Sequence, residues 1–327
     1  MRLTVSSVLL ITLILCVLHS VPIVYAENGG DWQVTTTKKA PPPEQKLPQP
    51  PLPEPPLPEI PDPPPPPPEP EKPKAQAFSF AVYGDSHTYP DTHGKILDLI
   101  CARKPAFIIN TGDVVFNGLN DKEWRKFKQI TEKVSNIPLY GTIGDHDKHV
   151  PFFVANYDTV DQSTWYSFKY ENCIFIVIDT IDDFSPSSYQ YSWITNQLHT
   201  VAASNTESKI FIIAHNAPYS TGAAGDENMQ TALVPLFKQY HVNAVLTGHG
   251  EYYEHIYNDG IDYFITGGGG APLSEQSKTA EWSRTFNSVH HYLYISVDND
   301  IIDVQAYSED DALLDAVNLS EQSDNSE

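Results

Sequence analysis

The chain has 327 residues, 28 of them proline, and a formal net charge of −22 at pH 7. So strong a negative charge repels nucleic-acid backbones and anionic membrane surfaces, and we expect neither as a main partner. The length allows one large domain or two small ones, once the segments that cannot form a hydrophobic core are set aside.

Residues 1–26 have the pattern of a secretory signal peptide. Arg2 precedes an apolar run, and the segment ends in small residues where a signal peptidase cuts. The alternative is an uncleaved membrane anchor, since residues 3–26 are nearly long enough to span a bilayer. Polar residues and Pro22 dilute the run and favour cleavage. We therefore expect a secreted or extracytoplasmic protein, with a membrane partner only if this segment is retained.

Residues 27–75 are predicted to be a proline-rich, disordered linker. Positions 41–74 hold 19 of the 28 prolines. This composition favours extended polyproline II and cannot bury a core. Such a spacer can hold a domain clear of a membrane or cell wall. A ligand for a proline-binding partner and an adhesive role of the segment are the alternatives.

Residues 76–308 read as one α/β domain, followed by an acidic tail at 309–327 that contains no Lys or Arg and is predicted to be disordered. Runs rich in β-branched and aromatic residues predict strands. They are Phe78–Tyr83, Ala106–Asn110, Leu139–Ile143, Trp165–Tyr170, Ile174–Ile178, Ile210–Ala214, Ala244–Leu246, Ile261–Ile265, Tyr292–Val297 and Ile302–Ala306. Helical periodicity predicts helices at Thr92–Arg103, Asp121–Val134, Tyr191–Leu198 and Met229–Tyr240.

The order of these elements changes along the domain. Early strands alternate with helices, whereas later strands follow one another through short turns. This order predicts a mixed sheet, or two packed mixed sheets, with helices outside.

Metal-ligand residue types follow five of the strand-like runs. Four runs end at a glycine and continue into such residues: AVYGDSH, INTGDVV, GTIGDHD and VLTGHGE; a fifth, FIIAHNAP, ends in a histidine. Glycine lets the chain turn sharply, and neighbouring strands in α/β folds converge on one crevice at their carboxyl ends. Each residue alone is weak evidence, because a lone His or Asp after a strand is usually a capping or solvated group. Together, the five predict a metal site.

The spacing of these residues suggests how two ions would be held. Asp85 and His87 are two positions apart, so in extended backbone both side chains can reach one cation. Asp113 can bridge two ions through its two carboxylate oxygens. Asp145, His215 and His249 would complete the second ion. Mixed oxygen and imidazole ligands suit Fe, Mn or Zn better than Ca or Mg.

The ordered motifs GDSH, GDVVFNG, GDHD, AHNAP and GHGE resemble those of the calcineurin-like metallophosphoesterases, in their purple-acid-phosphatase-like branch. The resemblance covers residues 77 to about 297, including WYSFKYENCIFIVIDT, QYSWITNQL and YFITGGGGAPL. It implies a four-layer sandwich of two packed mixed β-sheets flanked by helices. It also implies a hydrolase with two metal ions that cleaves a phosphate monoester or diester, either a small molecule or an exposed group.

The resemblance also assigns roles at the site. Asp85 and His87 would hold the first metal, Asp113 would bridge, and Asp145, His215, His249 and the less secure Glu251 would hold the second. A metal-activated hydroxide would be the nucleophile, His146 would donate a proton or hydrogen bond to the leaving group, and Asp147 would hold the His146 ring.

Three positions depart from the family pattern. Asp145 replaces the usual Asn, Glu251 replaces the usual second His, and Phe116 replaces the tyrosine ligand of purple acid phosphatases. The two added carboxylates would balance the charge of two divalent ions and weaken attraction for phosphate. Three outcomes stay open: the site prefers a trivalent ion such as ferric iron, Glu251 is not a ligand, or activity is weak. In the last case, the chain would be a metal- or ligand-binding module on the same fold.

Overall fold

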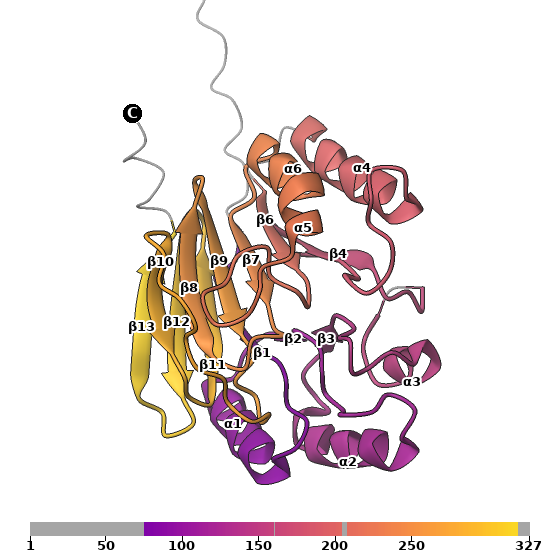
Figure 1. Ribbon diagram of the computed structural model, residues 1–327, viewed down its shortest axis with the longest axis vertical. Helices are drawn as coiled ribbons and strands as arrows, with labels where there is room; N and C mark the ends of the chain where they lie inside the picture. The colour runs from indigo at the N-terminus through magenta and orange to yellow at the C-terminus, as the bar shows by residue number, and fades with distance from the viewer. Residues whose placement is uncertain (1–74, 160, 205–207, 320–327) are drawn as a thin grey trace, which may run out of the picture. The chain divides into compact units, whose positions relative to one another are not determined.

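The computed structural model describes residues 75–159, 161–204 and 208–319, which form two sheets with helices on both outer faces (Figure 1). The predicted signal peptide and nearly all of the predicted linker lie outside these residues. None of the helices within these ranges is long and apolar enough to cross a membrane.

The six-stranded sheet has the order β13-β12-β11-β1-β2-β3. β1, β2 and β3 run parallel, whereas β11, β12 and β13 pair antiparallel with their neighbours, so the sheet is mixed. Its strands are β1 (Phe78–Tyr83), β2 (Ile108–Asn110), β3 (Leu139–Gly141), β11 (His291–Asp298), β12 (Ile301–Ser308) and β13 (Leu313–Asn318).

The seven-stranded sheet has the order β10-β8-β9-β7-β6-β5-β4. Its centre, β5-β6-β7-β9, is parallel, and the outer strands pair antiparallel. Its strands are β4 (Tyr166–Tyr170), β5 (Cys173–Val177), β6 (Lys209–Ile213), β7 (Ala244–Thr247), β8 (Tyr253–Asn258), β9 (Ile261–Thr266) and β10 (Ser283–Asn287).

Local side-chain caps start several of the helices. Asn120, Ser188 and Asp226 each accept a hydrogen bond from a backbone N–H of the first turn, which satisfies a group that has no partner inside the helix. The helices are α1 (Pro90–Arg103), α2 (Asp121–Thr131, continued by a 3-10 turn at Glu132–Val134), α3 (Val150–Val154), α4 (Tyr189–Ala203), α5 (Glu227–Ala232) and α6 (Val234–Gln239).

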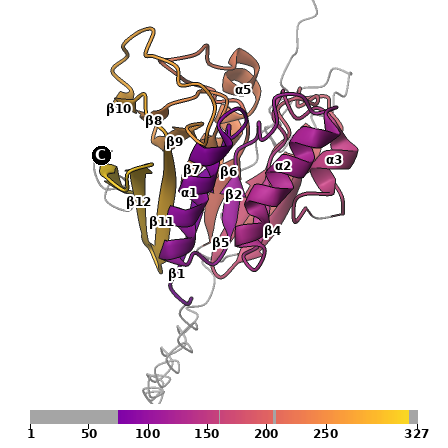
Figure 2. The ribbon, with the colours of Figure 1, turned by 90° about the horizontal axis from the view of Figure 1, so that it is seen from below.

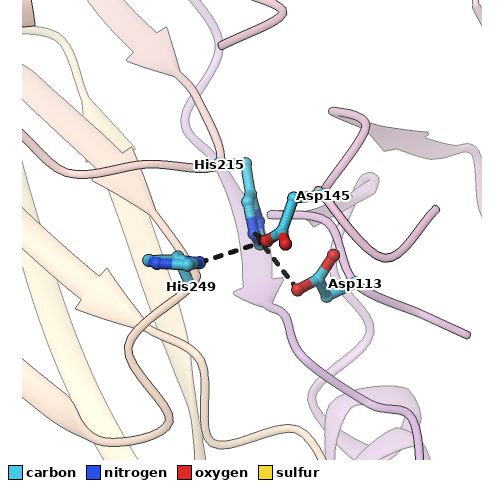
Figure 3. Close-up of side chains that lie close together, drawn as sticks. All are labelled: Asp113, Asp145, His215 and His249. Atoms are coloured by element: carbon cyan, nitrogen blue, oxygen red, sulfur yellow. Dashed lines mark ion pairs between the residues drawn. The ribbon is translucent and has the colours of Figure 1, made fainter. Parts of the chain in front are cut away.

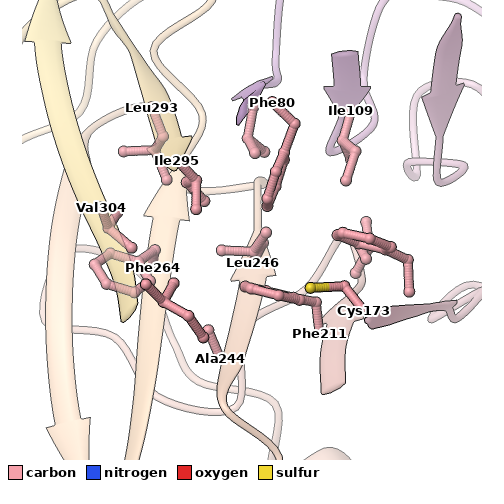
Figure 4. Close-up of a cluster of buried hydrophobic side chains, with 14 of the residues drawn as sticks. Phe80, Ile109, Cys173, Phe211, Ala244, Leu246, Phe264, Leu293, Ile295 and Val304 are labelled. Carbon is pink, nitrogen blue, oxygen red and sulfur yellow. The ribbon is translucent and has the colours of Figure 1, made fainter. Parts of the chain in front are cut away.

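Alternation along the strands separates three hydrophobic layers. Phe80 and Val82 of β1 point between the sheets, where they meet Phe211 and Leu246 of the second sheet (Figure 4). Ala81 and Tyr83, which alternate with them along β1, face the other way and pack toward α1 and α2. These two helices lie beside β1 and β2 in Figure 2. A third cluster joins the outer face of the second sheet to α4, α5 and α6. The predicted four-layer arrangement of helices, two sheets and helices is confirmed.

Three strands were not predicted, because their sequences lack a clear apolar period. In β8, Glu254 and His255 are buried but paired: Glu254 accepts from Thr221 and Ser283, and His255 contacts Asp262. β10 is a polar strand at the edge of the sheet. Burial of these polar groups depends on partners that are distant in the sequence.

β13 corrects the predicted boundary of the tail. Residues 313–318 were assigned to an acidic, solvated tail beginning at 309, yet they pair with β12, and Leu319 lies in the core between the sheets. Glu309, Asp310 and Asp311 lie in the turn before the strand, while Leu314 and Val317 pack against the core. Counting charge over the whole segment hid this short strand.

The helix predicted at Met229–Tyr240 is two helices. α5 ends at Ala232 and α6 begins at Val234, with Pro235 in its first turn. Proline has no N–H to donate to the preceding turn, so one helix cannot continue through this position. The short helix α3 was not predicted.

Candidate metal centre

The residues that the sequence indicated gather at the carboxyl ends of parallel strands. On the first sheet Asp85 follows β1, Asp113 follows β2 and Asp145 follows β3. On the second sheet His215 follows β6 and His249 follows β7. Packing of the two sheets brings these ends to one crevice.

The backbone at three of these residues is left-handed, with φ of 54° at Asp85, 52° at Asp113 and 63° at His249. Such a conformation costs of order 1–3 kcal/mol for a non-glycine residue and persists only where its surroundings enforce it. Here the loops after β1 and β2 brace each other: Asp85 N donates to Gly112 O (2.9 Å) and Ser86 N to Asp113 O (3.0 Å). The fold therefore holds these side chains in place at the expense of local strain.

Gly112 allows the two sheets to approach at this point. Its φ is +100°, and a Cβ placed on it would lie 2.6 Å from His215 Nδ1 and 3.0 Å from Gly144 N. Any larger residue would displace the His215 ring, so the glycine before Asp113 serves the site as well as the turn.

Four side chains converge on one point: Asp113, Asp145, His215 and His249 (Figure 3). Each offers a ligand atom, and these atoms all lie within 4.8 Å of one another. His215 Nε2 is 3.2 Å from Asp113 Oδ2 and 3.4 Å from Asp145 Oδ1. His249 Nδ1 is 3.3 Å from Asp145 Oδ1.

The tautomer of His215 shows that this group suits a cation. Its Nδ1 lies 2.8 Å from the carbonyl oxygen of Thr111, which can only accept, so Nδ1 carries the hydrogen. In its neutral form the ring directs the lone pair of Nε2 toward two carboxylates, and this buried nitrogen has no hydrogen-bond partner among the described residues. A positive charge between these atoms removes the repulsion between the Nε2 lone pair and the two carboxylates. The donor set of two imidazoles and two carboxylates fits a transition-metal ion.

The pKa values describe the same attraction for positive charge. Burial lowers the pKa of His215, but Asp113 and Asp145 outweigh it and hold that pKa well above its ordinary value. Burial likewise raises the pKa of Asp113, yet His215 overrides it and the net shift is downward. The adjacent imidazoles of His215 and His249 lower the pKa of Asp145. A proton and a metal ion therefore compete for the same place.

Asp85 and His87, predicted to hold the first metal, border the group of four without belonging to it. Both carboxylate oxygens of Asp85 accept from His249 N at 3.1 Å. Burial raises the pKa of Asp85, which is 1% exposed. His87 Nδ1 lies 2.6 Å from Thr88 Oγ1.

Glu251 also lies outside the group of four. Its Oε2 accepts a hydrogen bond from Ser274 Oγ at 2.7 Å. The carboxylate is still close enough to contribute to the raised pKa of Asp85. Glu251 therefore lies near Asp85, beside the group of four, as His87 does.

His146 and Asp147 are not paired as predicted. His146 Nδ1 lies 2.7 Å from the carbonyl oxygen of Phe116, so this carbonyl orients the ring. Asp147 is fully buried and accepts from the backbone N–H groups of Val114, Val115 and Gly144. The prediction that Asp147 holds the His146 ring is wrong: the Phe116 carbonyl orients that ring, and Asp147 joins the loops after β2 and β3 instead.

The functional groups at the centre that were not predicted from the sequence are mainly backbone atoms. The carbonyls of Thr111 and Phe116 fix the tautomers of His215 and His146, and a carbonyl leaves no signature in the sequence. Asn110 is a partial exception: its Oδ1 accepts from Gly112 N at 2.8 Å, as Asn before a tight turn often does.

Comparison with known proteins places this centre in context. Residues 78–250 match the family model described as calcineurin-like phosphoesterase. The chain is 28% identical over 176 residues to a purple acid phosphatase of Glycine max, covering 47% of this chain and 38% of that protein. It is 25% identical over 229 residues to a phosphoenolpyruvate phosphatase of Allium cepa, covering 62% and 47%. The chain thus spans about half the length or less of these relatives.

Solved structures support the fold. The purple acid phosphatase PPD1 from yellow lupin (Lupinus luteus) seeds superposes with a TM-score of 0.65 at 16% identity, over 75% of this chain and 54% of that one. GAP50, described as the anchor in the inner membrane complex of Plasmodium, gives a TM-score of 0.62 at 20% identity, over 74% and 88%. Both share the sandwich of two mixed sheets with flanking helices.

Proposed function

Because this chain belongs to the calcineurin-like phosphoesterase family, we propose that it is a metal-dependent phosphatase or phosphodiesterase. One observation carries the proposal: the buried Nε2 of His215 faces the carboxylates of Asp113 and Asp145 without a hydrogen-bond partner, with His249 alongside. Substrate class and metal identity are part of this proposal.

The residues would divide the work as follows. Asp113, Asp145, His215 and His249 would hold one ion, and Asp85 and His87, together with Asp113, would hold the other. When bound, two such cations polarise the phosphoryl group and lower the pKa of water toward neutrality. Hydrolysis joins the oxygen of water to phosphorus and breaks the bond to the leaving-group oxygen, which takes up a proton. His146 would supply that proton from Nε2 in its imidazolium form, with both ring nitrogens protonated, since Nδ1 is committed to the Phe116 carbonyl.

The charges at the centre favour an active site. Without Glu251 as a ligand, Asp85, Asp113 and Asp145 bring three negative charges against the four positive charges of two divalent ions. The remaining positive charge attracts a phosphate group locally, although the chain as a whole is strongly negative. Fe, Mn or Zn are the ions that this mixed donor set supports.

The second candidate is a metal- or ligand-binding module without turnover. Asp145 and Glu251 favour it, because both add negative charge near the metals. A relative that is 23% identical over 221 residues, from Arabidopsis thaliana, is described as a probable inactive purple acid phosphatase. Members of this fold thus include chains described without activity.

We further propose that the protein is exported and that the proline-rich segment spaces the domain from a membrane or wall. The support is the sequence of residues 1–26 and the 19 prolines at positions 41–74. Cell fractionation of a tagged full-length chain tests this part separately from the chemistry.

Metal analysis coupled to hydrolysis tests the function. We expect the purified full-length chain to retain about two transition-metal ions after dialysis and to hydrolyse a chromogenic phosphomonoester or diester. Asp113→Ala should lose metal and at least about 100-fold in kcat/KM, because Asp113 would help hold both ions and losing even a group that only supports a metal ligand typically costs about 10- to 100-fold. Asp310→Ala is the control, since the Asp310 side chain is 80% exposed and forms an ion pair with Lys95.

The outcomes separate the two candidates. Metal and turnover lost together in Asp113→Ala support the phosphoesterase. Metal bound by the wild type without turnover of either ester supports the binding module. A wild type that binds no transition metal contradicts both.

A further inference from the structure

A cavity of about 310 Å³ lies beside the metal centre, between the start of α1, α2 and the loops after β1 and β2. His87 forms part of its wall, so the cavity opens directly onto one of the expected metal ligands. Its volume falls at the lower end of the range for small-molecule sites. A dry cavity of about 150 Å³ already holds one benzene molecule, so this one has room for a ring with a substituent.

The walls of the cavity are largely apolar. Val115, Phe127 and Ile130 line it, together with Phe116, whose side chain is 62% exposed. The Phe116 ring centroid is 5.0 Å from that of His146 and 5.7 Å from that of His87. An exposed aromatic ring packed against these two histidines offers a flat apolar surface where the leaving group of an ester would lie.

The cavity also contains an unpaired cation. Lys126 is the one Lys or Arg among the described residues that line it, and no described residue forms an ion pair or hydrogen bond with its ammonium group. Glu123, also in the wall, is occupied: it accepts from Phe116 N (2.8 Å), Asn117 N (3.0 Å) and Asn120 Nδ2 (2.6 Å). In so acidic a chain, a free lysine beside the centre favours an anionic group on the ligand.

We propose that this cavity receives the leaving group of the substrate, and that this group is an aromatic ring carrying a second negative charge, which Lys126 contacts. The inference rests on the proposed function. The ring would lie against Phe116 with its phosphate at the metal centre. Water adds its oxygen to phosphorus, the phosphorus–oxygen bond to the aromatic alcohol breaks, and that oxygen takes a proton from His146, leaving phosphate and the alcohol.

Three synthetic esters separate ring recognition from charge recognition. Ethyl phosphate, benzyl phosphate and carboxybenzyl phosphate release alcohols of similar acidity, so differences in kcat/KM report on the cavity. We expect the wild type to prefer carboxybenzyl over benzyl phosphate, and benzyl over ethyl phosphate. Lys126→Met should lower the preference for carboxybenzyl over benzyl phosphate about fivefold, as expected for a partly exposed charge pair worth up to about 1 kcal/mol. The preference for benzyl over ethyl phosphate should stay nearly intact.

Two further variants complete the test. Lys128→Met removes an exposed lysine from the same helix that does not line the cavity, and it should leave both preferences unchanged. Ile130→Trp should fill the cavity and lower the preference for benzyl over ethyl phosphate. Retained metal content shows that each variant is folded, and the exposed Lys126→Met keeps the test decisive if Ile130→Trp does not fold.

The failures are distinguishable. A wild type that hydrolyses none of the three esters, nor the chromogenic ones, contradicts the proposed function itself. Hydrolysis of all three at similar kcat/KM overturns only the leaving-group cavity. Equal effects of Lys126→Met and Lys128→Met would show that the lysine acts through bulk charge and would overturn its assigned contact.

Discussion

At the scale of single residues, the centre depends on how each imidazole is oriented. His215 and His146 each use Nδ1 to donate to a backbone carbonyl, which leaves Nε2 directed at the chemistry. The two rings differ in burial: His215 is completely buried among acids, whereas His146 is partly exposed beside Phe116. One ring therefore suits metal binding and the other suits proton transfer to a substrate.

Replacing His146 with Gln should separate these roles. We expect kcat to fall about 100-fold in His146→Gln, within the usual range for loss of a general acid, while the metal content stays unchanged because His146 is not among the proposed metal ligands. The loss should be larger for ethyl phosphate than for nitrophenyl phosphate, since a poor leaving group needs the proton more.

A matched variant is His199→Gln, at an exposed position on α4. It should leave kcat unchanged for both esters. Equal losses in His146→Gln for good and poor leaving groups would argue that His146 positions the phosphate rather than donating a proton.

At the scale of elements, the site depends on short turns after strands. Six residues of β1 and three of β2 are regular, and each then turns through a left-handed residue into the crevice. The parallel pairing of β1 with β2 and of β2 with β3 sets the spacing of the three aspartates. The register of these strands thus determines the positions of the three aspartates at the centre.

A Cβ at Gly112 should disturb this geometry. Gly112→Ala combines an unfavourable φ with a clash on the His215 ring, so we expect a loss of stability of at least about 1 kcal/mol together with weaker metal binding. Thermal unfolding and metal titration measure the two effects.

Gly260→Ala is the control for backbone strain alone. Gly260 has a comparable φ of +83°, but a Cβ placed on it would have nothing within 4 Å. This variant should lose stability without losing metal affinity. Weakened metal binding in both variants would indicate that stability, not the His215 contact, controls the site.

At the scale of the whole molecule, buried neutral histidines make stability depend on pH. Burial lowers the pKa of His93 to about 3, with Lys133 adding to the effect, and lowers the pKa of His291 to about 4. His93 Nε2 lies 3.1 Å from Tyr83 OH inside the fold. Both rings must stay neutral in the folded state, whereas the unfolded chain binds a proton at about pH 6.5.

The sign of the effect follows from that difference. Below about pH 6.5 the unfolded state binds protons at His93 and His291, whereas in the folded state both rings stay neutral. The contribution of the two residues to the free energy of unfolding therefore falls as the pH drops toward 4. Asp147, whose pKa burial raises to about 7, acts in the opposite direction over the same range, so the comparison must be with a variant.

Denaturant unfolding of wild type and His93→Gln between pH 7 and pH 4 measures the contribution of His93. Gln keeps a polar partner for Tyr83 but does not titrate. The stability of the wild type should fall more steeply than that of the variant, and the exposed His199→Gln should follow the wild type. Parallel curves for wild type and His93→Gln would contradict the assignment.

The sequence by itself determined the α/β class, most strands and the residues of the centre. Strand-forming runs and the turns after them are local features, and five such turns, four of them opened by a glycine, place Asp and His at strand ends whatever the detailed packing. The predicted signal peptide and most of the linker lie outside the described residues and stay predictions.

Only the tertiary structure decided which of these residues meet. It grouped Asp113, Asp145, His215 and His249, left Glu251 outside, turned Asp147 away from His146 and joined β8, β10 and β13 to the sheets. Each of these outcomes depends on a partner far along the chain, often a backbone atom. Local sequence carries the identity of a ligand; the distance between ligands arises only when the two sheets pack.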